Sequence, residues 1–335
     1  EEDIATIDSE FETYDQAYVW LKSAYAYMQD LYDRWDDVTH TGSDELVADN
    51  YMRNTLYYHP EGLDIIGGMQ NVLDPYGDTW LNITSANGVP CRKDFYTQIV
   101  ICNHFITRID NVYNLPDKDK EEWKAEVVAL KAFYYFELVR RYGPVMIVPD
   151  QFDPNQDVET LKLPRLHVDT CFNYIVSLCD EVDLLPSCNA KQSERRGYFN
   201  KEAVMALKAR ALCYQASDLF NGNPDYGNLK NKQGEPLFSS TADPQKWERA
   251  AQAAIDLINY CSETGSANLV SGNSANTELQ GYMLDIERSI QTFGWLSDEV
   301  LYMIRLQQGD GLFNYTLPNF DDGSNHTLPG ACLTP

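Results

Sequence analysis

Positive charge is scarce in this sequence. Lys and Arg number 26 against 51 Asp and Glu, which gives a net charge of −25 and an isoelectric point near 4.4 over 335 residues. Nucleic acids and anionic membranes also carry negative charge, so this chain would approach them against electrostatic repulsion. We therefore expect no nucleic-acid partner, and the charge favours a neutral or cationic ligand.

Long apolar runs and metal-binding cysteine patterns are also missing. No segment reaches the ~18 consecutive apolar residues of a membrane-spanning helix, and Glu1-Glu2-Asp3 is unlike a signal peptide. We expect a soluble chain, or one whose leader was removed. The eight cysteines form no CxxC pair, which excludes the common zinc and redox motifs. An even number permits disulfides without requiring them. Four cysteines have apolar neighbours in helical patterns and are expected to be buried: Cys102, Cys179, Cys213 and Cys261.

Catalytic signatures are absent as well. The sequence contains no HExxH, GxSxG, GxxxxGK or GxGxxG pattern, and no two of its five histidines lie at helical pairing distance. Acidic doublets such as Asp36-Asp37 are expected by chance in so acidic a chain. Asp321-Asp322 opens part of a calcium-loop pattern but lacks the later bidentate Glu, and calcium binding by this loop stays an open alternative. We predict no catalytic residue, no metal site and no cofactor.

Helical periodicity is the strongest positive signal. After the N-terminal signal Asp243-Pro244, apolar residues recur at helical spacing from Trp247 to Ile258. Strand signals are sparse, and Val145 to Val148 is the best of them. The predicted fold class is therefore mainly α. Helices are predicted at about 15–34, 93–112, 119–142, 167–185, 200–220 and 244–260.

The helices contain a short internal repeat. Ala129-Leu130-Lys131-Ala132 recurs as Ala206-Leu207-Lys208-Ala209, which favours a tetratricopeptide-like superhelix of helical pairs with long irregular loop insertions. We predict a single domain over residues 1–335, with the helical scaffold at about 14–263. The loop-rich regions, at about 36–94 and 265–335, are where we expect the ligand, because irregular segments of that length usually carry function.

Aromatic residues outside the helical stripes are the candidate ligand contacts among 22 Tyr, 13 Phe and 6 Trp. Sugars stack flat C–H faces on exposed rings, while their hydroxyls form hydrogen bonds with polar side chains. Trp80 is the strongest candidate because it follows a turn and no helix is predicted to bury it. Trp123 and Trp247, on apolar helical stripes, are expected in the core instead. The predicted ligand-binding residues are Trp80, Tyr76, Trp295, Tyr315, Trp35 and Phe320.

One segment resembles a known family. Residues 129–145, ALKAFYYFELVRRYGPV, combine an aromatic helix face with a basic last turn and a Gly-Pro stop. This pattern resembles the signature of the SusD/RagB family of nutrient-binding outer-membrane lipoproteins. The resemblance covers about residues 14–305. Other matches follow in the family's order: Tyr96, Ile99 and Asn103, then Arg165 to Pro186, Gly197 to Phe220, and Trp247 to Ile258.

The resemblance implies a function and a location. It implies a non-catalytic, surface-exposed lipoprotein of the cell outer membrane, of Bacteroidetes type, that binds oligosaccharide or polysaccharide and delivers it to a SusC-like TonB-dependent transporter. Members of the family are usually longer, so this chain resembles their N-terminal two thirds or a short member. The lipid-bearing Cys is absent from the sequence, so membrane attachment through an N-terminal anchor is implied only.

Two other classes of function stay open at this stage. A tetratricopeptide-type module that binds a peptide or protein would have the same helical pattern. An all-α glycoside hydrolase or lyase is the less favoured alternative, and the release of product from a polysaccharide would distinguish it from a binding protein.

Overall fold

The computed structural model of the chain describes residues 7–30, 46–47, 66–68, 95–151, 156–182, 184–188, 197–268, 300–302 and 332–333. The chain divides into two compact units. The first comprises Glu1–Ala24 and Phe95–Met303, and the second comprises Tyr25–Asp94 and Ile304–Pro335. The expected single domain stays a prediction.

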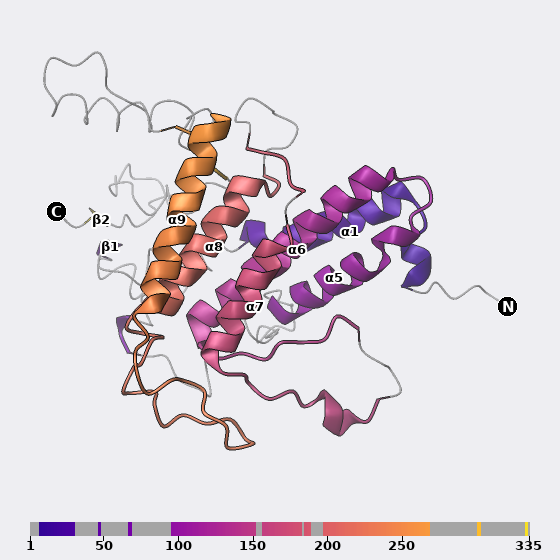
Figure 1. Cartoon of the computed structure of the whole chain (residues 1–335). Coiled ribbons are helices and arrows are strands. Elements are labelled where there is room, and N and C mark those ends of the chain that lie inside the picture. Colours follow the sequence, from indigo (N-terminus) through magenta and orange to yellow (C-terminus); the bar gives the residue numbers. More distant parts are fainter. Residues whose placement is uncertain are drawn as a thin grey trace, which may run out of the picture. The chain divides into compact units, whose positions relative to one another are not determined.

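The described elements are mostly helices (Figure 1). In the second unit, strand β1 (Leu46–Val47) pairs antiparallel with β2 (Cys332–Leu333). Three short 3-10 helices are η1 (Asp8–Phe11), η2 (Ile109–Asn111) and η3 (Val158–Leu161). The α-helices are α1 (Tyr14–Asp30), α5 (Phe95–Arg108), α6 (Asp117–Tyr142), α7 (Val168–Asp180), α8 (Lys201–Ala216) and α9 (Gln245–Thr264).

Neighbours in sequence are also neighbours in space within the first unit. Helix α5 packs on α6, α6 on α7, α7 on α8, and α8 on α9 (Figure 1). Short-range pairing of this kind is typical of helical-repeat architectures. The prediction of a mainly α fold built from helical pairs is confirmed.

Helix α6 is the central element of this arrangement. Its residues from Ala125 to Val139 are nearly all buried, and a helix that is apolar around most of its circumference belongs in a core. The Tyr134 hydroxyl donates a hydrogen bond to the Ala24 carbonyl oxygen at 2.6 Å, which ties α6 to α1. The helix ends at Gly143, whose φ of 70° is a conformation that favours glycine. The predicted Gly-Pro stop is confirmed.

A buried carboxylate lies in the last turns of α6. Glu137 is 1% exposed and accepts hydrogen bonds from Arg140 Nη2 at 2.7 Å and from Arg141. Burial opposes the ionisation of Glu137, but the two guanidinium groups outweigh it and hold its pKa below the usual 4.5. Glu137 is therefore ionised at neutral pH and locks the two arginines against the helix.

The stability of the fold should depend on this carboxylate. Because the folded pKa is depressed, the stabilisation is present above the unfolded pKa and is lost as the pH falls below about 4.5. We expect Glu137→Gln to lower the free energy of unfolding by about 3 kcal/mol at pH 7. The unfolding free energy of this variant should also decrease less between pH 7 and pH 3.5 than that of the parent. Urea denaturation at pH 7 and 3.5 measures both effects. The matched control is Glu121→Gln, at an exposed position in the second turn of the same helix. An equal loss in both variants would contradict this role of Glu137.

The apolar stripe predicted for α9 is only partly buried. Trp247, Ile255 and Ile258 are 50%, 48% and 66% exposed, so the prediction that Trp247 lies in the core is wrong. Helix α9 buries Ala250, which belongs to the stripe, together with Ala253 against α8, so its buried face is rotated by roughly a quarter of a turn from the middle of the stripe. Small residues let the two helices approach closely. Trp123 is 9% exposed, and its predicted burial is confirmed.

The two tryptophans should differ in their contribution to stability. Trp123→Ala removes a buried ring from α6 and is expected to cost about 3–5 kcal/mol of unfolding free energy. Trp247→Ala removes a half-exposed ring and is expected to cost less than about 1 kcal/mol. Chemical denaturation of both variants measures the difference. Similar losses would show that the Trp247 ring is covered in solution.

Two further predictions are corrected by the structure. The structure describes residues 95–151, and Val145 to Val148 form no strand there. Two backbone N–H groups of this segment form hydrogen bonds with side chains instead of with a neighbouring strand. The Met146 N–H donates to the Tyr96 hydroxyl and the Val148 N–H donates to the Tyr135 hydroxyl. Cys213 is exposed, since it lies on the face of α8 opposite the buried Ala211 and Leu212 positions, whereas Cys102, Cys179 and Cys261 are buried as predicted.

Candidate functional site

The six ligand-binding residues predicted from the sequence lie outside the described residues. Trp35, Tyr76, Trp80, Trp295, Tyr315 and Phe320 therefore stay predictions. Within the described part of the first unit, the candidate site is a groove of about 480 Å³ between α7, α8 and α9. That volume is in the range of small-molecule sites.

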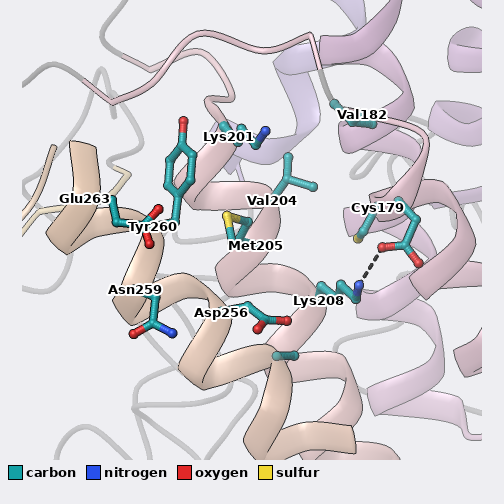
Figure 2. Close-up of a pocket in the computed structure, with 12 residues that line it drawn as sticks. Cys179, Val182, Lys201, Val204, Met205, Lys208, Asp256, Asn259, Tyr260 and Glu263 are labelled. Atoms are coloured by element: carbon teal, nitrogen blue, oxygen red, sulfur yellow. Dashed lines mark hydrogen bonds and ion pairs between the residues drawn. The ribbon is translucent and has the colours of Figure 1, made fainter.

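Helix α8 forms the middle of the groove. Figure 2 shows it between α9 on one side and α7 on the other. Val204 and Met205 supply an apolar surface in the centre, and Cys179 at the end of α7 adds to it. Asn200 caps the start of α8 by accepting a hydrogen bond from the Ala203 N–H at 2.8 Å. The cap fixes the start of α8, and so it fixes the position of Lys201 in the lining of the groove.

Opposite charges occupy neighbouring helices of the groove. Lys201 and Lys208 are seven residues apart on α8, so they lie on one helix face two turns apart. Asp256 and Glu263 have the same spacing on α9. The groove thus offers ammonium donors from α8 and carboxylate acceptors from α9 (Figure 2).

Several of these groups already have partners within the protein. Lys208 Nζ lies 2.5 Å from Asp180 Oδ1, and Asp256 Oδ1 accepts a hydrogen bond from Gln252 at 2.8 Å. Lys201 Nζ lies 5.2 Å from the centre of the Tyr260 ring, within the range of a cation–π contact. The Tyr260 hydroxyl is 2.8 Å from Ser187 Oγ. These contacts hold the lining side chains in fixed positions.

The groove is suited to a ligand that carries both donors and acceptors. Its lysines, carboxylates and the Asn259 amide can exchange hydrogen bonds with hydroxyl or amide groups, while Met205 and Val204 contact an apolar face. Burial raises the pKa of the Cys179 thiol to about 12, so this sulfur is a neutral thiol at physiological pH. Among the described residues, no group of three or more His, Cys, Asp or Glu is placed to hold a metal ion.

Sequence reasoning missed this groove. The one signal available was a seven-residue spacing that occurs twice, between two lysines of one predicted helix and between two acidic residues of another. That signal is weak because it does not tell which helices are neighbours, and only the packing of α9 on α8 brings the two rows together.

The fold is shared with solved structures. The protein named BT4246 has a TM-score of 0.73 at 23% identity, over 96% of this chain and 56% of that one. A SusD-like protein from Bacteroides fragilis, BF3747, has a TM-score of 0.61 at 20% identity, over 93% of this chain and 48% of that one. A SusD-like carbohydrate-binding protein from the same species, BF0978, has a TM-score of 0.50 at 18% identity, over 78% of this chain and 42% of that one.

These comparisons establish the fold. The chain has the SusD-like fold, which confirms at the level of structure the resemblance found in the sequence. It spans about half the length of the structures it matches. No protein-family model matches the sequence, and no curated protein matches it either. In the described part of the chain, no helix combines the length and apolar character needed to cross a membrane.

Thiol reactivity tests the geometry of α7 and α8. At pH 8 we expect iodoacetamide to modify Cys213, which is exposed, well before Cys179, which is buried beside the groove with a raised pKa. Peptide mass spectrometry over a time course measures the two rates. Both thiols should react at similar rates in urea. Equally fast modification of Cys179 in the folded protein would contradict its burial.

Proposed function

We propose that this chain belongs to a non-catalytic protein that binds oligosaccharide or polysaccharide at the cell surface and delivers it to a SusC-like TonB-dependent outer-membrane transporter. The observation that carries the proposal is the SusD-like fold, matched over 96% of the chain at a TM-score of 0.73. One solved structure with this fold is named a carbohydrate-binding protein. The sequence signature at residues 129–145 points to the same family independently.

Physical chemistry gives the proposal a mechanism of binding. Ring stacking supplies affinity without bond breaking, and we assign it to the loop aromatics, with Trp80 first among them. Hydrogen bonds from polar side chains then select the sugar by its hydroxyl pattern. The absence of the common hydrolase motifs from the sequence agrees with a protein that binds without turnover.

Location and transport rest on the fold alone. A binding protein that serves an outer-membrane transporter has to stay at the cell surface, and an N-terminal lipid anchor would hold it there. We therefore propose a surface-exposed outer-membrane lipoprotein, with the anchor outside the present sequence.

A peptide ligand is the second candidate function. The groove between α7, α8 and α9 favours it, because lysines on α8 and carboxylates on α9 suit the two charged ends and the amides of a short peptide. Binding of peptides but not of any polysaccharide would support this function and contradict the first.

Affinity electrophoresis tests the proposed function. We expect at least one gel-embedded polysaccharide from a panel to slow the migration of the protein. Trp80→Ala should abolish this retardation because it removes the principal stacking ring. The control Trp247→Ala removes a half-exposed tryptophan outside the proposed ligand contacts and should be retarded like the parent. A parent protein that passes every gel unretarded would contradict glycan binding. A folded Trp80→Ala variant that is retarded like the parent would show that the site lies elsewhere.

A further inference from the structure

A smaller cavity lies between α5 and the segment that follows α6. Its volume is about 130 Å³. That volume holds more than one water molecule, at about 10–15 Å³ each, and is below the ~300 Å³ of the smallest drug-sized sites. Four residues of α5 at helical spacing form one side of it. We call this cavity the α5 pocket, and its lining residues are Val100, Asn103, His104, Arg108, Asp150 and Gln151.

Asn103 brings a buried, unpaired acceptor to the α5 pocket. The residue is 3% exposed, and its Nδ2 donates a hydrogen bond to the Pro149 carbonyl oxygen at 3.1 Å. That bond fixes the orientation of the amide. In the part of the chain that the structure describes, the Asn103 Oδ1 has no hydrogen-bond partner. A buried acceptor without a partner is unfavourable, so a ligand that donates a hydrogen bond to this oxygen gains affinity.

Arg108 and His104 supply donors to the same pocket. Arg108 Nε lies 2.7 Å from Asp8 Oδ1, and Arg108 Nη1 lies 3.2 Å from His104 Nδ1. Because a guanidinium group can only donate, His104 Nδ1 is the acceptor and the ring carries its proton on Nε2. Burial and the charge of Arg108 lower the pKa of His104, so the ring is neutral at pH 7. Arg108 Nη2 and His104 Nε2 keep N–H groups that no other described residue accepts.

Asp150 and Gln151 complete the polar lining. Asp150 Oδ1 lies 2.6 Å from Nζ of the buried Lys131, an ion pair that holds the carboxylate in place and leaves Oδ2 as an acceptor. Gln151 is exposed, and its amide can both donate and accept. Val100 adds an apolar surface on α5. The pocket therefore presents acceptors, donors and one apolar contact within a small volume.

This combination selects a ligand that carries hydroxyl groups. An ionised anion would bind Arg108, but it has no proton for the Asn103 Oδ1 and would be repelled by the Asp150 carboxylate. A cation would be repelled by Arg108. A hydroxyl group donates and accepts at once, so it satisfies both kinds of lining group without a charge. The volume limits such a ligand to about one sugar ring.

We propose that the α5 pocket binds one neutral sugar ring, either as a free monosaccharide or as the terminal unit of a longer chain. Asn103 and Asp150 accept hydrogen bonds from its hydroxyl groups, and Arg108 and His104 donate to its oxygens. The site uses none of the predicted loop aromatics and shares no lining residue with the groove between α7, α8 and α9. It goes beyond the proposed function, because a single ring can occupy it whether or not a polysaccharide binds elsewhere.

Chemical modification of His104 tests the α5 pocket in the unaltered protein. Diethyl pyrocarbonate acylates neutral imidazole rings, and mass spectrometry measures the rate at each histidine. At pH 7 we expect at least one neutral hexose or pentose from a panel to slow the modification of His104 threefold or more. The sugar is added at about 20 mM, above the dissociation constant on the order of 1 mM expected for so small a ligand. His167, with a side chain 26% exposed, is the matched control and should react at the same rate with and without sugar.

The form of the sugar is distinguished in the same experiment. Protection of His104 by free monosaccharides identifies the free sugar as the ligand, and protection by short oligosaccharides alone identifies the terminal unit of a chain. An unchanged rate at His104 with every sugar would overturn the proposal. Gel retardation by a polysaccharide together with an unprotected His104 would overturn the α5 pocket and leave the proposed function standing.

Variants of the lining provide the second test, with the sugar that protects His104. Arg108→Met keeps the length of the side chain, removes its donors and should weaken binding at least tenfold in an NMR titration. Val100→Phe keeps every polar group, fills the cavity and should weaken binding as much. The control Lys124→Met also loses one positive charge and one ion pair, with Asp110, but outside the pocket, and should bind within about twofold of the parent. Parent-like binding by folded Arg108→Met and Val100→Phe variants would contradict the assignment of the sugar to this pocket.

Discussion

The buried ionised carboxylate of Glu137 is the interaction on which the first unit of this protein depends. It lies at 1% exposure in the last turns of α6, the helix on which α5 and α7 pack. A charge in that position is tolerated only because Arg140 and Arg141 neutralise it. Both arginines follow Glu137 in the same helix, so the pairing forms as the helix forms. The Gly143 turn comes immediately afterwards and directs the chain away from the helix end.

A second buried charge organises the other end of the helical array. Asp169 in the first turn of α7 accepts from Gln215 of α8 at 3.0 Å and pairs with Lys246 of α9 at 2.6 Å. Lys246 is only 6% exposed, so this ion pair sets the rotation of α9 about its axis. That rotation turns the alanine face toward α8, leaves Trp247 outside, and places Asp256 and Glu263 beside the lysines of α8. The groove is therefore a consequence of the same contacts that hold the helices together.

Sequence reasoning identified the helices because each carries its own local signals, such as the Asn200 cap and the Gly143-Pro144 stop. It failed where the outcome depends on a partner distant in sequence. The apolar stripe from Trp247 to Ile258 was a sound helical pattern, but the ion pair with Asp169 decides which face of α9 is buried. Val145 to Val148 has strand-like composition, yet the hydroxyls of Tyr96 and Tyr135 take its backbone hydrogen bonds. The predicted loop aromatics stay predictions.

The central claim is that a helical scaffold of SusD-like fold binds a polysaccharide without cleaving it. Size-exclusion chromatography of the parent chain incubated with a polysaccharide that retards it in gels tests this claim most directly. The account predicts that protein and polysaccharide elute together and that the recovered polysaccharide keeps its original length distribution. Separate elution, or the appearance of shortened chains, would contradict it.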